Sequence, residues 1–126
     1  MLNCGDTFLT GEEDDQSLHL WIVLTPPIEG EVVIASVTTL RRMSETLVVL
    51  RPGDHPFLRH DSVISYAYSK ITTVEAIETA ILNGTAKLRE PVSEAVLRRV
   101  RAGLLDSDFT PNGVRHYYRD VMRDAE

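Results

Sequence analysis

The chain has 126 residues, of which 43% are hydrophobic and 25% are charged, and its formal net charge is −6 at pH 7. This length suits a single domain (residues 1–126) with one core, and the composition is that of an ordinary globular protein. The acidic balance disfavours non-specific binding of duplex nucleic acid by bulk attraction. No apolar run approaches the ~20 residues that a membrane-spanning helix needs, so no membrane partner is expected.

The cysteine content and the first residues indicate the cellular compartment in which the protein is expected. A single cysteine, Cys4, excludes an internal disulfide and is typical of a reducing environment. Residues 1–5 lack the charged start and the apolar centre of a signal peptide, so we expect a cytoplasmic protein. The charge is unevenly distributed, because acid gathers at residues 12–15 and base at 41–42 and 98–101. A local basic groove is therefore compatible with the negative total.

The first half of the chain is predicted to form strands. Residues 5–9 are a short strand candidate, and the polar, acidic segment 10–18 is expected to be an exposed, mobile loop. Residues 19–25 and 32–39 are apolar, largely β-branched runs that flank a turn with two prolines and a glycine, which indicates neighbouring strands. Neither run alternates cleanly, so both faces of each strand should be covered, as in a small closed or strongly curled sheet.

Two further strands are expected before the pattern changes. Residues 46–50 end at the turn signal 51–53, and the segment 54–61 is irregular and rich in charge and in histidine. Residues 62–69 alternate between two sides, which predicts a fifth strand. The bulkier side, which we expect to face inward, carries Ile64, Tyr66 and Tyr68.

From about residue 72 the apolar period changes to 3.6, which indicates helices. Thr72 and Glu75 have the spacing of a capping box for a first helix, and Asn83-Gly84 is a typical helix end. A second helix is predicted over 91–105, and Thr110-Pro111 should open a third. The apolar stripe of that third helix, expected to face the core or an interface, consists of Val114, Tyr117, Tyr118, Val121 and Met122. Five strands followed by three helices predict an α+β domain.

The order of these segments resembles the MazF/PemK superfamily of plasmid-maintenance toxins, which are small SH3-like barrels and include the CcdB gyrase poisons. The resemblance covers roughly residues 5–105. The residues that carry it are Gly5-Asp6, the runs 21–25 and 33–39, and the strand 62–65 that leads into 69–73. It implies an SH3-like β-barrel of about five strands at about 5–72, and two to three helices at about 73–124. The C-terminal helix is an addition to the minimal family pattern.

The same resemblance implies a function. It is that of an endoribonuclease toxin of a type II toxin–antitoxin system, a homodimer that cleaves single-stranded RNA and is bound by an antitoxin protein. Such enzymes use no metal or other cofactor, because the RNA's own 2′-hydroxyl attacks the phosphorus. The protein has to transfer protons and to neutralise the charge that grows on the phosphate.

Site residues follow from the resemblance by position. His19 replaces the family's arginine ahead of the second strand and is the expected proton carrier, since imidazole exchanges protons near neutral pH. Thr38 and Thr39 stand where the family has Thr-Ser and would donate hydrogen bonds to the scissile phosphate. The cations expected to bind RNA phosphates are Arg41, Arg42 and Lys70.

Two other functions stay open. One is a catalytically inactive SH3-like module that binds a protein partner, either an antitoxin-like segment or a gyrase-type target. The other is a secondary site at His55 and His60, either as metal ligands or as an acid–base pair. These histidines lie in an irregular loop with no evident third ligand, so no metal site is predicted. For Thr38 and Thr39 the simpler interpretation is that they end a strand.

Overall fold

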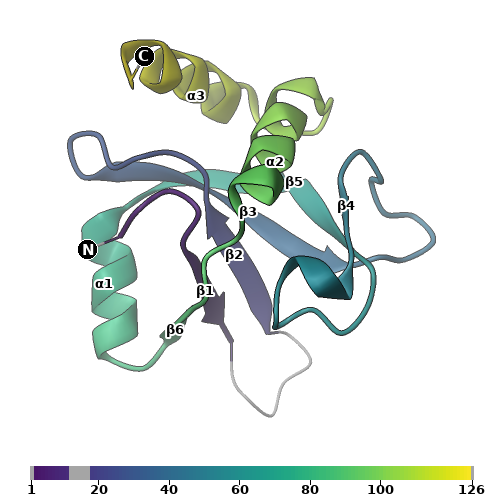
Figure 1. Cartoon of the computed structure of the whole chain (residues 1–126). Helices are drawn as coiled ribbons and strands as arrows, with labels where there is room; N and C mark the ends of the chain where they lie inside the picture. The colour runs from purple at the N-terminus through teal and green to yellow at the C-terminus, as the bar shows by residue number, and fades with distance from the viewer. Residues whose placement is uncertain (1, 12–17, 126) are drawn as a thin grey trace.

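The computed structural model of the protein describes residues 2–11 and 18–125, so most of the predicted loop 10–18 lies outside the described residues. The described residues form one antiparallel sheet of six strands and three helices, with the spatial strand order β4-β5-β3-β2-β1-β6 (Figure 1). The strands are β1 (Thr7–Thr10), β2 (His19–Val23), β3 (Glu31–Thr39), β4 (Val49–Leu50), β5 (Ser62–Thr73) and β6 (Ala86–Arg89). The helices are α1 (Val74–Leu82), α2 (Glu94–Asp106) and α3 (Asn112–Ala125), and a 3-10 turn, η1, spans Pro52–Asp54.

The predicted α+β class is confirmed. The sheet is curled into a half-barrel, consistent with a small SH3-like α+β fold, and its two edge strands are β4 and β6. The strand β6 is not predicted from the sequence, because its four residues alternate between apolar and cationic side chains but include no β-branched or aromatic residue. It pairs with β1, where Leu88 lies opposite Phe8. No helix in the described part of the chain is long and apolar enough to cross a membrane.

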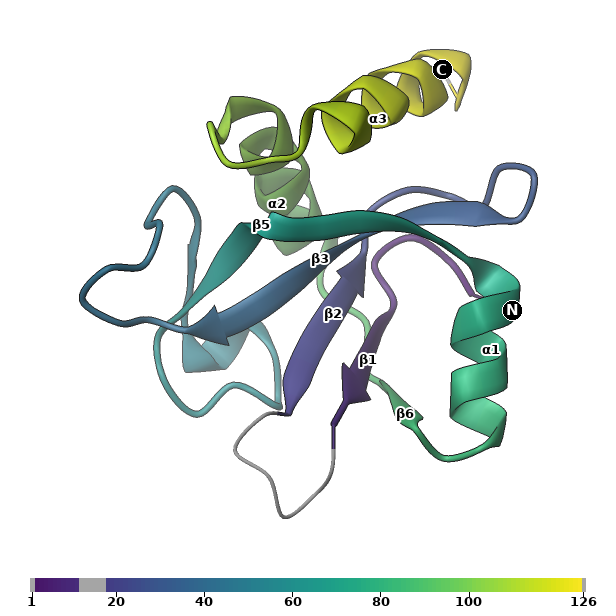
Figure 2. The same ribbon diagram turned by 180° about the vertical axis from the view of Figure 1, so that it is seen from behind.

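Each face of the sheet packs against different helices. The inner face, which carries Leu20, Ile22 and Val37, packs against α2 and α3. The outer face, which carries Val23 and Ile34, packs against α1. Accordingly α2 lies in front of the sheet in Figure 1 and behind it in Figure 2. The expectation that β2 and β3 are covered on both faces is confirmed by the complete burial of the neighbours Ile22 and Val23.

The strand β5 departs from simple alternation because of a bulge. Ser36 of β3 lies opposite Ser65, but Ile34 lies opposite Lys70, so a single β3 residue faces four residues of β5. The hydroxyl of Ser69 donates to the Tyr66 carbonyl at 2.7 Å and closes this bulge. As a result, Tyr66 is fully buried whereas Tyr68 is 70% exposed. The prediction that Tyr68 faces inward was wrong.

The helix ends follow local side-chain chemistry. The cap of α1 is Thr73, whose hydroxyl accepts from the Ala76 amide at 3.0 Å, so the predicted capping box is displaced by one residue. The cap of α2 is Ser93, as its position before the apolar stripe indicates. The Thr110 hydroxyl donates to the Leu104 carbonyl at 2.7 Å and therefore binds the end of α2, although it was expected to cap α3.

Candidate functional site

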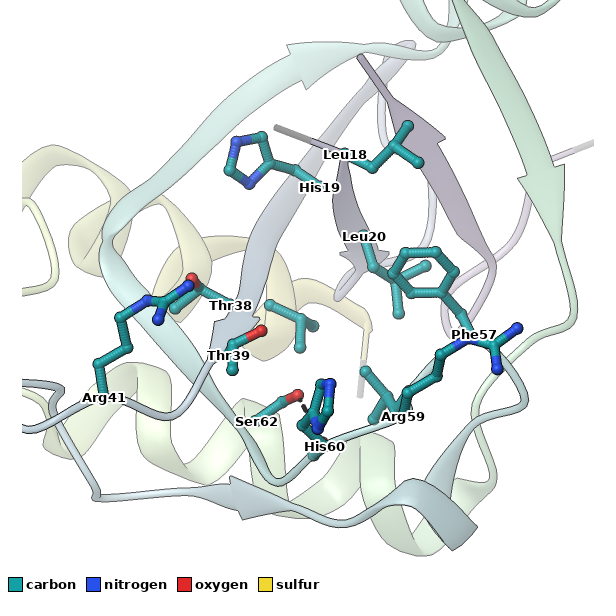
Figure 3. Close-up of a pocket in the computed structure, with 12 residues that line it drawn as sticks. Leu18, His19, Leu20, Thr38, Thr39, Arg41, Phe57, Arg59, His60 and Ser62 are labelled. Atoms are coloured by element: carbon teal, nitrogen blue, oxygen red, sulfur yellow. Dashed lines mark hydrogen bonds between the residues drawn. The ribbon is translucent and has the colours of Figure 1, made fainter. Parts of the chain in front are cut away.

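The ends of β2 and β3 meet the segment 57–60 at a pocket of about 290 Å³ (Figure 3). Its apolar wall consists of Leu18, Leu20, Val37, Phe57 and Leu58. Its polar lining residues are His19, Thr38, Thr39, Arg41, Arg59, His60 and Ser62. Two imidazoles, two guanidinium groups and three hydroxyls therefore share one pocket, which we call the imidazole pocket.

The strand register explains how these side chains meet. Leu20 pairs with Val37, and the same register, extended by one residue, places His19 opposite Thr38 on the outer face. Thr39 pairs with Ser62, and both lie on the inner face. The pocket therefore wraps around the end of the sheet. Figure 3 shows His19, Thr38 and Arg41 on one side, and Thr39, Ser62 and His60 gathered nearer its centre.

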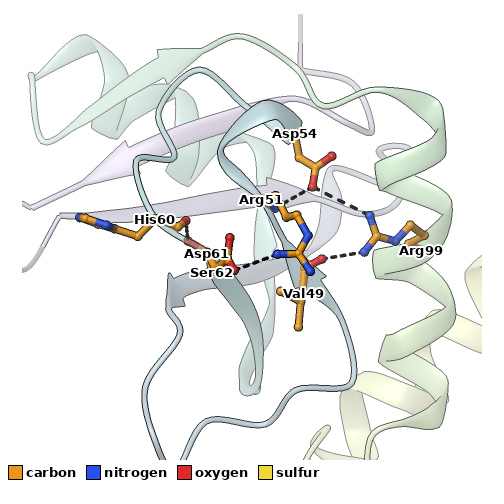
Figure 4. A network of polar contacts seen from close by, with 7 residues as sticks. All are labelled: Val49, Arg51, Asp54, His60, Asp61, Ser62 and Arg99. Carbon is orange, nitrogen blue, oxygen red and sulfur yellow. Dashed lines mark hydrogen bonds and ion pairs between the residues drawn. The ribbon is translucent and has the colours of Figure 1, made fainter.

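Backbone and side-chain contacts hold His60 at the pocket (Figure 4). The Ser62 hydroxyl donates to the His60 carbonyl at 3.0 Å. The next residue, Asp61, accepts from the Arg51 guanidinium at 2.9 Å through its carboxylate and from the Leu40 amide at 2.9 Å through its carbonyl. Asp61 is thus engaged with Arg51, and the exposed His60 ring is left facing the pocket.

The far end of the same segment is fixed to α2. The carboxylate of Asp54 accepts from the Arg51 amide at 2.8 Å and lies 4.0 Å from the Arg99 guanidinium. Arg99 also donates to the Val49 carbonyl at 2.6 Å (Figure 4). These contacts join η1, β4 and α2, so the segment that carries Phe57, Arg59 and His60 is held at both ends.

His55 has a structural environment and does not line the imidazole pocket. Its side chain is 2% exposed, and Nδ1 accepts from the Phe57 amide at 3.0 Å. Because Nδ1 is an acceptor, Nε2 carries the hydrogen and donates to the Glu90 carbonyl at 2.6 Å. The hydroxyl of Thr7 lies 3.2 Å from the same nitrogen. The structure therefore does not bring His55 and His60 together, and no group of three or more His, Cys, Asp or Glu residues in 2–11 and 18–125 could hold a metal ion.

The two remaining predicted cations lie outside the pocket. Arg42 is exposed on the turn after β3 and is not among the lining residues. Lys70 lies on the outer face with its ammonium 5.0 Å from the centre of the Trp21 ring. The Lys70–Trp21 pair borders a separate groove beside α1.

Sequence reasoning missed Arg59 and Ser62. For Arg59 a signal is present, since the segment 54–61 is rich in charge and in histidine, and Ser62 begins the predicted strand 62–69, but both meet β2 and β3 only through long-range packing. A comparison with protein-family models found no match, and neither did a comparison with curated proteins. Function therefore has to be inferred from the geometry of the pocket.

Proposed function

We propose that this protein is a metal-independent endoribonuclease, a toxin of the MazF/PemK kind, that cleaves single-stranded RNA by attack of the 2′-hydroxyl. One observation carries the proposal: His19, His60 and Arg41 line the same pocket together with three hydroxyl side chains. Cleavage of an RNA phosphodiester needs a base, an acid and a cation around one phosphate, and this set supplies all three.

The two imidazoles divide the proton transfers. His19 on β2 takes the proton of the 2′-hydroxyl, and His60 gives a proton to the departing 5′-oxygen. The 2′-oxygen then bonds to phosphorus, the P–O5′ bond breaks, and the products carry a 2′,3′-cyclic phosphate and a free 5′-hydroxyl. A pair of imidazoles suits this exchange, since the imidazole side chain can both accept and donate a proton.

Charge on the phosphate is stabilised by the remaining polar groups. Arg41 presents a planar, permanently charged guanidinium that matches two phosphate oxygens. In the described part of the chain its side chain pairs with no carboxylate. Thr39 lies beside Ser62 across the β3–β5 ladder, and its hydroxyl can donate to the phosphate while the Ser62 hydroxyl donates to the His60 carbonyl. Thr38, on the outer face beside His19, orients the ribose.

Cleavage in the presence of EDTA tests the proposal. The protein should cut single-stranded RNA to fragments that end in a 2′,3′-cyclic phosphate, and His19→Ala and His60→Ala should each lower the rate by about 10²–10⁴-fold. His116→Ala is the matched control, because His116 lies on α3 with an 83% exposed side chain and should leave the rate unchanged. A parent protein that cuts no RNA, or a His19→Ala variant as fast as the parent, would refute this mechanism.

A second function, the non-catalytic module that binds an antitoxin-like segment, is favoured by one surface observation. Met43 and Phe109, which are 91% and 63% exposed, line a groove of about 230 Å³ that shares Thr38 with the imidazole pocket. Exposed apolar side chains of this size are typical of contact with a partner. A protein that forms a stable complex with an antitoxin-type peptide, cleaves no RNA and does not slow the growth of cells that express it would fit this second function.

A further inference from the structure

A second, basic pocket adjoins the imidazole pocket. It has a volume of about 250 Å³ and lies on the inner face between β6 and the segment 56–59. Leu18, Phe57 and Arg59 line both pockets, so the two form one continuous groove. In Figure 3 the side chains of Phe57 and Arg59 lie at the end of the imidazole pocket away from Arg41.

Cations dominate this second pocket. Arg59, Lys87 and Arg89 line it, and none of its lining residues within 2–11 and 18–125 is acidic. Lys87 and Arg89 belong to β6, where they pair with Leu9 and Thr7 and therefore project from the inner face. Three cations at one pocket are a concentrated positive charge in a chain whose net charge is −6.

The two arginines are available to an anionic ligand. Within residues 2–11 and 18–125, neither Arg59 nor Arg89 forms an ion pair with a carboxylate. The guanidinium carbon of Arg89 lies 5.9 Å from the centre of the Phe57 ring. Stacking on an aromatic ring fixes the guanidinium plane while its N–H donors, which lie in that plane, still point outward.

We infer that this basic pocket binds the phosphate next to the scissile one, so that the protein recognises at least two successive phosphates of a single strand. The inference rests on the proposed function for the identity of the scissile phosphate. Arg59, shared by both pockets, lies between the two phosphates, and Arg89 binds the second. The groove therefore selects polynucleotides over dinucleotides.

Binding of short deoxythymidine oligomers tests this without any cleavage, because they lack the attacking 2′-hydroxyl. We expect oligomers with two phosphates to bind the parent protein at least about fivefold more tightly than the oligomer with one phosphate. Arg89→Gln should abolish this gain, and Arg89→Lys should restore part of it. For the two-phosphate oligomer, Arg89→Gln should also reduce the slope of log affinity against log salt by about 0.7.

Arg98→Gln is the control, because Arg98 is exposed on α2, is absent from both pockets, and its loss changes the net charge by the same amount. A thermal unfolding curve verifies that each variant is folded. The inference would be overturned if the second phosphate improved binding equally in the parent and in Arg89→Gln. It would also be overturned if Arg98→Gln lost as much of this improvement as Arg89→Gln. If the gain depends on Arg89 but the protein cuts no RNA, the basic pocket stands and the nuclease proposal fails. If RNA is cut but the gain is absent, only the basic pocket is refuted.

Discussion

Nδ1 of the buried His55 accepts a hydrogen bond from the amide of Phe57, two residues further along the chain, at 3.0 Å. With the bond from Nε2 to the Glu90 carbonyl, this imidazole joins the segment 55–60 to the strand pair β1 and β6. The same segment supplies Arg59 and His60 to the groove. A histidine that lines neither pocket thus helps to determine where those two side chains lie.

Replacement of His55 should therefore weaken the fold. His55→Phe leaves the partly buried Phe57 amide without its acceptor and removes the bond to the Glu90 carbonyl, so the free energy of unfolding should fall by about 2–3 kcal/mol. Urea denaturation at neutral pH measures this loss. His116→Phe on the exposed side of α3 should change the stability by less than about 0.5 kcal/mol. Equal stabilities of the two variants would contradict the anchoring role of His55.

Neighbouring arginines should differ in their effect on RNA cleavage. Arg41 lines the imidazole pocket and Arg42 does not, although both carry the same charge on the same turn. Arg41→Ala should lower kcat by about 10²–10³-fold, as expected when a group that stabilises developing charge is removed. Arg42→Ala should stay within about threefold of the parent. The measurement is the rate of single-turnover cleavage of one RNA substrate by each variant. Equal losses of rate would mean that the two arginines act only through the net charge of the protein.

Alanine at Gly103 should destabilise the protein, although alanine usually stabilises a helix. A Cβ on Gly103 would meet the Tyr66 hydroxyl and would lie 2.8 Å from Cγ2 of Val48. We expect Gly103→Ala to cost about 1–3 kcal/mol, against a gain of up to about 1 kcal/mol at an open helix position. Gly113→Ala in α3 is the control, because no heavy atom lies within 4 Å of its Cβ position. If Gly103→Ala and Gly113→Ala move the denaturant midpoint in the same direction, the close packing around Gly103 is refuted.

Alkaline pH should reveal the burial of Tyr66. Burial, reinforced by the charge of Glu45, raises the pKa of Tyr66 well above its usual value. The unfolded chain releases this proton above about pH 10 while the folded chain retains it, so this contribution to stability is complete below pH 10 and is lost as the pH rises further. Tyr66→Phe also removes the hydrogen bond to the Val100 carbonyl, which should cost about 1–2 kcal/mol near neutral pH.

The stability difference between the parent and Tyr66→Phe should therefore shrink above pH 10, by at most about 1.4 kcal/mol per pH unit. Urea denaturation at pH 8, 10 and 11 measures it. Tyr68→Phe, which alters a 70% exposed side chain, controls for the change of residue type. A difference that stays constant from pH 8 to 11 would show that the Tyr66 hydroxyl ionises equally in both states.

Local sequence patterns predicted the strands and helices whose buried positions carry apolar residues. The runs that became β2 and β3 are apolar and largely β-branched, and the stripe that became α2 has a helical period, so composition and period identify them. The strand β6 has only four residues, none of them β-branched or aromatic, and its pairing with β1 depends on the rest of the fold. Tyr68 was misassigned because a bulge changes the period within one strand, and nothing in the local sequence marks where it falls.

The residues of the candidate site likewise divide into those that could be expected from the sequence and those whose position depends on tertiary contacts. His19 begins β2, and Thr38 and Thr39 end β3, so their proximity could be expected once the two strands were taken as antiparallel neighbours. Arg59 and His60 reach the pocket through the bonds of His55, Asp54 and Asp61 to residues far away in sequence. Such contacts depend on tertiary structure, so spacing within the segment could not assign these residues to either pocket.

Both outermost strands of the sheet are short, since β4 has two residues and β6 has four. The border at β6 offers few unpaired backbone groups and also carries two cations, an arrangement that discourages edge-to-edge aggregation. At the other border, β4 pairs only with Ser62 and Val63 of the twelve-residue β5, so most of that edge of β5 has no strand partner among the described residues. Strand addition by a second copy of this chain, or by any other protein, is therefore discouraged at β6, and the open stretch of β5 is the edge at which the sheet can be extended.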